Sequence, residues 1–494
     1  MPRPTKIAPL AAVLVLAAAS PALAQVHQTP TVSPIGDGSA LPYQIEIDAV
    51  DFNGAVLPTL HSYARAEHGG LWVMMAGRTN GLHAFTGLGD VNFPEASQNR
   101  DVWVVDPATG QAWSRSLQDV SAGLSADQVA SLTPTNNQFA QVGDRLYMTG
   151  GYGLRADGQF DTFNTLSAID LPGIIDWVQN GTGSAADHIR QVEDESFRVT
   201  GGAMHDIDGT MHLVFGQSFQ GPYIPNRNGQ YTNQVRHFTI ADDGTTLGFT
   251  NASASSPDAD FRRRDLNVYT TLRPDGNGGH ERGMVALSGV FTEGFGAWTV
   301  PVVMDESGNP TMDDPTDPGT FRQGFNGYHS AKIGLYSQTT GEMHELLFGG
   351  ISLQTQDDNG DTVTDDFLPF VNDATSVVID AEGNFTQHHL GVFPEMLDGE
   401  GNVLRFGANA EFFVADGIAM LEHDIIDLDA LSGETVIGYI VGGLFSNAPH
   451  TRGVDGAVSG GNNQVFAVTF TAIPEPGSLA LVLVGGLSLM RRRR

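Results

Sequence analysis

The sequence predicts an all-β fold, a β-propeller, and three observations lead to this class. The chain of 494 residues contains 60 Gly and 25 Pro, which is typical of many short strands joined by turns. A unit with a polar or aromatic entry, a Gly or Asp turn and an alternating apolar strand that ends in Gly recurs six times. Further strand signals follow each unit, and four strands per repeat make a propeller blade.

The six repeats cover most of the chain. They begin at His61, Asn136, Gly201, Asn267, Gly327 and Ala408, and their apolar strands end at Gly77, Gly150, Gly216, Gly289, Gly349 and Gly442. The spacings of these glycines are 73, 66, 73, 60 and 93 residues. We expect six four-stranded blades over residues 43–472, and a seventh blade in the longest gap is the alternative.

Strands that follow the repeats supply the outer parts of the blades. The segment "DVWVVDPATGQAWSRSL" from Asp101 is a strand, an Asp-Pro-x-x-Gly turn and a second strand. The segments "YQIEIDAVDF" from Tyr43 and "QVFAVTF" from Gln464 are expected to pair and so to close the ring. Such a closure would leave only short sheet edges exposed.

These units resemble the kelch repeat, in which a glycine pair closes the second strand and an Asp-Pro-x-x-Gly-x-x-Trp turn follows. The first unit has Trp103, the turn from Asp106 to Gly110 and Trp113, but Arg78 follows Gly77 where the repeat has a second glycine. The pair is kept at Gly150-Gly151, Gly349-Gly350 and Gly442-Gly443, and is lost at Gly216-Gln217 and Gly289-Val290. The resemblance covers residues 45–471 and implies a kelch-like β-propeller.

Residues 1–24 have the features of a secretory signal peptide. Arg3 and Lys6 give a basic start, an apolar stretch runs from Ile7 to Ala19, and Ala22-Leu23-Ala24 is a small-residue cleavage site. The apolar stretch is a signal helix too short to span a bilayer. We expect export, a mature chain that begins at Gln25, and a linker over residues 25–42.

Residues 473–494 form a separate C-terminal segment. Pro474, Glu475 and Pro476 precede 14 uncharged residues, Gly477 to Met490, and the chain ends in Arg491, Arg492, Arg493 and Arg494. An apolar helix of this length is shorter than the roughly 20 residues that span a bilayer, and the arginines favour the cytoplasmic side. The order of these parts resembles the PEP-CTERM sorting signal.

The resemblance to PEP-CTERM proteins implies an exosortase as a partner. This membrane protease would recognise Pro474-Glu475-Pro476, remove the tail and deliver the protein to the cell envelope, cell surface or extracellular matrix of a bacterium that makes exopolysaccharide. Before processing, the short C-terminal helix would hold the chain in the inner membrane; an uncut tail anchor is the alternative. The net charge of -32 argues against a nucleic-acid partner, because phosphates would be repelled.

Candidate binding residues come from the loops expected at the mouth of the propeller channel. The segment "AGRTNGLHAF" places Arg78, Asn80 and His83 after an apolar strand, where a guanidinium could bind a carboxylate or sugar oxygens, or could clamp its own loop to a carboxylate. The corresponding parts of the repeats contain His61, His205, His329 and Asn137. These side chains either surround a ligand or hydrogen-bond the backbone of neighbouring blades.

A second motif is "FRRRD", which concentrates Arg262, Arg263 and Arg264 in a chain that is poor in basic residues. It predicts either an anionic ligand or an internal ion-pair network. Acidic loops are separate candidates for calcium, with Asp357, Asn359 and Asp361 as oxygen ligands. Thr362 stands where a calcium-binding loop requires glycine, so solvated loops and no cofactor are favoured.

Signatures of catalysis are few. The sequence contains no Gly-x-Ser-x-Gly elbow, His-Glu-x-x-His helix, Walker loop or cysteine. We therefore expect a non-catalytic propeller that binds a glycan or a protein. The alternative is an extracellular sugar-active enzyme of epimerase or lyase type, with Arg78 as anion clamp and His61, His205 or His329 as acid or base. That alternative requires the histidines to converge near Arg78.

Overall fold

The computed structural model describes residues 32–52, 56–83, 92–224, 229–294, 296–357, 359–422, 424–450 and 458–473. The expected signal peptide and the sorting segment from Pro474 onward lie outside the described residues. Within the described ranges, no helix is long and apolar enough to cross a membrane.

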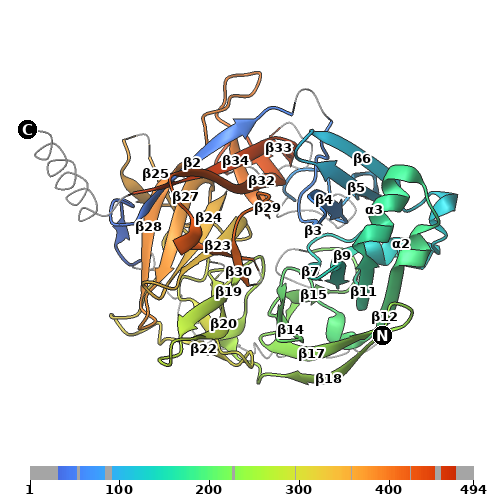
Figure 1. Ribbon diagram of the computed structural model, residues 1–494, viewed down its shortest axis with the longest axis horizontal. Helices are drawn as coiled ribbons and strands as arrows, with labels where there is room; N and C mark the ends of the chain where they lie inside the picture. The colour runs from blue at the N-terminus through green and yellow to red at the C-terminus, as the bar shows by residue number, and fades with distance from the viewer. Residues whose placement is uncertain are drawn as a thin grey trace, which may run out of the picture. The chain divides into compact units, whose positions relative to one another are not determined.

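Most strands belong to antiparallel sheets set around a common axis as propeller blades (Figure 1). Four sheets have four strands each. From the inner strand outward they are β3 (Ala64–His68), β4 (Leu71–Met75), β5 (Asp101–Asp106) and β6 (Gln111–Ser116); β7 (Gln138–Val142), β8 (Arg145–Thr149), β11 (Thr165–Asp170) and β12 (Ile189–Glu193); β13 (Ala203–Ile207), β14 (Thr210–Val214), β17 (Val235–Asp242) and β18 (Leu247–Ala254); and β19 (Asn267–Pro274), β20 (His280–Leu287), β21 (Val302–Met304) and β22 (Pro310–Met312).

The sheet that closes the ring contains strands from both ends of the described chain. Its order is β2 (Tyr43–Val50), β34 (Val465–Ala472), β32 (Glu434–Ser446) and β29 (Arg405–Val414), and β33 (Ser459–Gly461) pairs with β32. β2 and β34 are antiparallel, with Tyr43 opposite Ala472 and Val50 opposite Val465. The predicted pairing of these two segments is confirmed.

The largest sheet has seven strands and departs from the expected blade. Its order is β1 (Ile35–Gly36), β28 (Phe385–Val392), β27 (Phe370–Ile379), β24 (Glu342–Ile351), β23 (Ala331–Ser337), β31 (Ile425–Asp427) and β30 (Met420–Glu422). β1, which lies in the expected linker, and β31 add by parallel pairing to the two edges of an antiparallel meander. The expectation of six or seven four-stranded blades is therefore wrong: among the described residues five sheets have the four or five strands of a blade, and the seven-stranded sheet does not fit that pattern.

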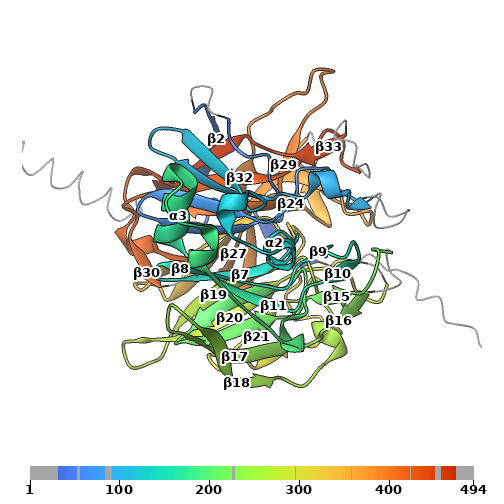
Figure 2. The same cartoon turned by 90° about the vertical axis from the view of Figure 1, so that its right-hand side faces the viewer.

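Three short hairpins and two helices complete the elements discussed below. The hairpins are β9 (Tyr152–Leu154) with β10 (Phe160–Thr162), β15 (Gln217–Phe219) with β16 (Gly229–Tyr231), and β25 (Gln354–Gln356) with β26 (Thr362–Thr364). Figure 2 shows β9, β10, β15 and β16 together on one side of the blades. The helices α2 (Ala126–Leu132) and α3 (Leu171–Asn180) pack on the first two sheets, and Trp177 of α3 is fully buried there.

Five backbone hydrogen bonds link six residues of neighbouring inner strands around the axis. One residue at each inner strand has a positive φ: Ser62, Asn136, Gly201, Asp265 and His329 lie at the turn before the strand, and Asn409 lies within β29. The bonds run from the N–H of one turn to the carbonyl of the preceding one: Asn136 to Ser62 (3.2 Å), Gly201 to Asn136 (3.0 Å), Asp265 to Gly201 (2.7 Å), Asn409 to His329 (2.6 Å) and Ser62 to Asn409 (3.1 Å). We call these six residues the turn ring.

A second set of turns lies at or near the end of the second strand of each repeat, and the turns at Gly349 and Gly442 fall inside β24 and β32. Two consecutive residues have a positive φ, and the pairs are Ala76-Gly77, Gly150-Gly151, Phe215-Gly216, Ser288-Gly289, Gly349-Gly350 and Gly442-Gly443. The apparent loss of a glycine after Gly77 is therefore a shift of register, because Gly77 is the second member of its pair. The second member of every pair is glycine because neighbouring atoms occupy the position of a Cβ. For example, a Cβ on Gly151 would lie 2.7 Å from Cγ of Pro134.

Gly151→Ala is expected to destabilise the fold by roughly 3 kcal/mol, because a Cβ meets both a left-handed backbone and an occupied space. Gly143→Ala is the matched control. Gly143 also has a positive φ, but nothing lies within 4 Å of its Cβ position, so the cost should be about 1 kcal/mol. Urea unfolding followed by circular dichroism measures both values, and equal losses would contradict the packing argument.

Candidate functional site

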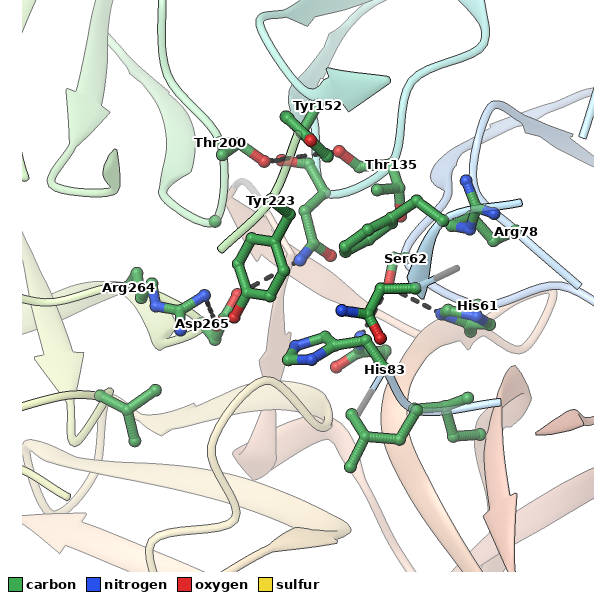
Figure 3. Close-up of a pocket in the computed structure, with 18 of the residues that line it drawn as sticks. His61, Ser62, Arg78, His83, Thr135, Tyr152, Thr200, Tyr223, Arg264 and Asp265 are labelled. Atoms are coloured by element: carbon green, nitrogen blue, oxygen red, sulfur yellow. Dashed lines mark hydrogen bonds and ion pairs between the residues drawn. The ribbon is translucent and has the colours of Figure 1, made fainter. Parts of the chain in front are cut away.

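A cavity of about 100 Å³ is built from equivalent positions of the repeats. The residue after each glycine turn lines it; these residues are Arg78, Tyr152, Gln217, Val290, Ile351 and Leu444. Isolated bridges pair His61 with Arg78, Thr135 with Tyr152, Thr200 with Gln217, Arg264 with Val290, and Tyr328 with Ile351. Figure 3 shows side chains from several blades around this space. We call it the Arg78 cavity.

Arg78 is a buried cation at this cavity. It is 2% exposed, its Nε donates to Oδ1 of Asn80 at 2.9 Å, and its Nη2 donates to the carbonyl of Pro94 at 2.6 Å. The guanidinium lies over the Phe93 ring, 5.2 Å from the centroid. Among the described residues no carboxylate forms an ion pair with Arg78, so the clamp to a carboxylate is not found there. Burial lowers the pKa of Arg78 to about 10, which leaves it charged at neutral pH.

Aromatic side chains form one wall of the Arg78 cavity. The ring of Tyr223 lies 4.8 Å from that of His83, 5.3 Å from that of Phe93 and 5.0 Å from that of Phe219. Tyr152 packs edge-on against Phe93 at 5.2 Å, and its hydroxyl donates to the carbonyl of Gly221 at 3.0 Å. Rigid, mostly apolar rings beside a charged group are suited to a ligand with both a flat apolar face and a polar edge.

The "FRRRD" motif divides into structural and cavity residues. Arg264 lines the cavity and forms an ion pair with Asp265 at 3.2 Å, as Figure 3 shows. Arg263 is fully buried, donates to the carbonyl of Ser288 at 3.2 Å and lies over the Trp298 ring, and burial lowers its pKa to about 9. Arg262 stacks on Tyr231 at 3.9 Å. Of the three arginines of the motif, only Arg264 lines the cavity. The two arginines of the lining, Arg78 and Arg264, and the one carboxylate, Asp265, give the cavity a net charge of +1.

His61 lies beside Arg78 in the same cavity. It is 6% exposed, its Nδ1 lies 3.0 Å from the Ser62 hydroxyl oxygen, and its Nε2 has no hydrogen-bond partner in the described part of the chain. Burial, and then the charge of Arg78, lower the pKa of His61 to about 3. The imidazole is therefore neutral at physiological pH and is a weak base.

The structure divides the predicted site residues between two cavities. His61, Arg78, Asn80 and His83 line the Arg78 cavity. His205, His329 and Asn137 line a second cavity of about 530 Å³, which we call the channel cavity. His61 and His83 therefore lie with Arg78, whereas His205 and His329 line the other cavity, so the convergence of histidines that the enzyme alternative requires is only partial.

The calcium candidates form a hairpin turn. Oδ1 of Asp357 accepts hydrogen bonds from the backbone N–H groups of Asn359 at 2.9 Å and Asp361 at 3.0 Å, between β25 and β26. These bonds lower the pKa of Asp357 and occupy one of its oxygens. No cluster of three or more His, Asp or Glu suited to a metal occurs among the residues that the structure describes.

Sequence reasoning missed the aromatic wall and Asp265. The sequence could have identified Tyr152 as a site residue, because Tyr152 follows the second glycine-turn residue of its repeat as Arg78 does. Phe93 and Tyr223 lie on connecting segments and Phe219 lies in the short strand β15, all outside the repeated pattern, so no equivalent signal marks them in the sequence. The position after the glycine turn is therefore the sequence marker of cavity-lining residues in this chain.

The low pKa of His61 should make stability depend on pH. Unfolding returns the group to its ordinary pKa near 6.5, so the unfolded chain binds a proton between about pH 6.5 and 3 and native stability falls as the pH falls. Relative to His61→Asn, the wild type should lose about 2.5 kcal/mol more between pH 6 and pH 4. Urea unfolding of both proteins at the two pH values tests this, and equal losses would refute it.

Comparison with known proteins gives a fold-level likeness only. No family model matches the chain, and no curated protein matches it. Among solved structures, 147 chains are similar, including the one described as "Structure of YjhT". That structure has 10% sequence identity and a TM-score of 0.40, and the match covers 84% of this chain and 98% of YjhT. At this level of similarity YjhT carries no argument about function.

Proposed function

We propose that this chain is an exported envelope or matrix protein whose propeller binds an acidic glycan in the Arg78 cavity, without catalysis. The observation that carries the proposal is the buried guanidinium of Arg78, which lines a cavity and has no carboxylate partner among the described residues. A buried charge is costly unless a partner compensates for it. A carboxylate on the ligand would be such a partner, and a guanidinium binds it with paired hydrogen bonds.

The surroundings of Arg78 favour a sugar acid over a simple anion. The wall of Phe93, Phe219 and Tyr223 offers apolar faces for the C–H side of a pyranose ring. Asn80 and Thr200 add neutral polar groups at the edge of the same cavity. The positive charge of this cavity is local, because the chain as a whole carries a net charge of -32. A negatively charged ligand is therefore expected here rather than across the surface.

Binding without catalysis fits the histidines better than enzyme chemistry does. General acid or base catalysis is most efficient when the pKa of the group lies near the working pH. His61, with a pKa of about 3, is far from that range, and His205 and His329 line the other cavity. His61, His205 and His329, the acid or base candidates of the epimerase or lyase alternative, are therefore not well placed for that chemistry.

Loss of the guanidinium should remove the selectivity for acidic glycans. On an array of acidic and neutral oligosaccharides, with calcium and with chelator, the wild type should prefer acidic ones. Titration calorimetry with the best acidic oligosaccharide should show at least thirty-fold weaker binding for Arg78→Ala, which corresponds to about 2 kcal/mol for a charge-assisted pair. Arg78→Lys should give an intermediate loss, because it keeps the charge but loses the planar fork.

Arg282→Ala is the matched control for this experiment. Arg282 is a partly buried arginine that binds Asp208 and Glu422 and does not line the Arg78 cavity. Its loss should leave glycan binding unchanged. Acidic-glycan binding that survives Arg78→Ala would exclude the proposed site.

The export and sorting part of the proposal rests on the two ends of the sequence. The signal-peptide pattern of residues 1–24 directs the chain outward, and Pro474-Glu475-Pro476 with the apolar run and Arg491–494 would be read by an exosortase. The structure adds that the last strand, β34, ends at Ala472, two residues before Pro474. The proposed recognition site therefore follows directly after the folded sheet.

Processing can be tested by co-expression with an exosortase in a bacterium. Mass spectrometry of the wild type should show loss of the tail, and the protein should leave the membrane fraction. A triple variant, Pro474→Ala, Glu475→Ala and Pro476→Ala, should keep its full length and stay with the membrane. Equal retention of the tail in both proteins would instead support a permanent anchor.

A further inference from the structure

The channel cavity is separate from the Arg78 cavity. Asn136 and Gly201 line the Arg78 cavity, whereas the next residues, Asn137 and Gly202, line the channel cavity. The turn ring therefore lies between the two. The channel cavity, at about 530 Å³, is the larger, and the function proposed above does not use it.

Carboxylates outnumber cations in the lining of the channel cavity. Arg65 lies between three carboxylates, with nitrogen-to-oxygen distances of 3.6 Å to Glu67, 3.7 Å to Glu411 and 3.7 Å to Asp424. With Lys332 and Asp206 included, two cations face four carboxylates, so the net charge of the lining is -2. An anion would be repelled, in contrast to the Arg78 cavity.

A second feature of this cavity is a set of neutral hydrogen-bonding groups without partners among the described residues. Asn137 is 7% exposed, and neither the nitrogen nor the oxygen of its amide has a hydrogen-bond partner among the described residues. Oε1 of Gln138 and Nδ1 of His329 also have no hydrogen-bond partner among the described residues. Burial lowers the pKa of His329 to about 4, so its ring is neutral. Each unpaired buried group costs about 1–3 kcal/mol, which a ligand that both donates and accepts would recover.

We propose that the channel cavity binds a neutral sugar of one or two rings, with the Asn137 amide bonding to its hydroxyl groups. Hydroxyl groups donate and accept, as the mixed set of Asn137, Gln138 and His329 requires. The cavity volume lies within the range of small-molecule sites. The protein then holds two chemically different sugars on opposite sides of the turn ring, and neither site depends on the other.

Binding of neutral disaccharides to the full chain tests this proposal. Cellobiose, maltose and lactose are titrated into the full chain, and binding is followed by saturation-transfer NMR. The chain is kept in a zwitterionic detergent, so that no sugar headgroup competes for the cavity. At least one disaccharide should bind the wild type. Asn137→Leu keeps the side-chain size but removes both amide atoms, and it should weaken binding at least ten-fold. Ala203→Phe adds a ring to a lining residue of β13, and it should also weaken binding at least ten-fold by filling the cavity.

Arg78→Ala is the matched control, because it alters the other cavity and should leave disaccharide binding unchanged. Circular dichroism checks the fold of each variant, and if Asn137→Leu does not fold, Ala203→Phe decides alone. The proposal is overturned if none of the three disaccharides binds, if binding survives the cavity variants, or if Arg78→Ala weakens binding equally. If the wild type binds a disaccharide but no acidic glycan, only the function proposed for the Arg78 cavity is refuted.

Discussion

Backbone hydrogen bonds between the six residues of the turn ring are the constraint on which the rest of the structure depends. Five bonds hold neighbouring inner strands together at these residues, each of which has a left-handed backbone. Peptide groups buried at the centre of a propeller must find partners, and the ring supplies them from the chain itself. Both cavities are placed by this ring, one on each side of it.

A nearly symmetric backbone produces an asymmetric site. The position after the glycine turn is equivalent in all the repeats, yet it carries Arg78, Tyr152 and Gln217 in the first three and Val290, Ile351 and Leu444 in the last three. At this one position the first three repeats are therefore polar and the last three apolar. Because the backbone geometry is shared, the chemistry of this site can change by single side chains without any change to the fold.

The sequence was sufficient for the architecture where a pattern repeats. The recurring glycines marked the turns, and the alternating segments at Tyr43 and Gln464 identified the closing strands. The seven-stranded sheet could not be predicted, because β1 and β31 each add only two or three residues by parallel pairing. Arg78 and His61 were predicted together, but the assignment of His329 and Asn137 to another cavity depends on which side of the turn ring each residue faces. Periodicity does not encode that choice.

The position of β34 has a mechanical consequence. This strand is flanked on both sides, by β2 and by β32, and it is the last strand before the chain leaves the folded sheet. A tensile force applied at the C-terminal end of β34 and directed along it would shear two hydrogen-bonded ladders at once, instead of opening one bond after another. An outward-facing protein tethered through this end would resist extraction with the strength of a central strand, although its attachment point is the end of the chain.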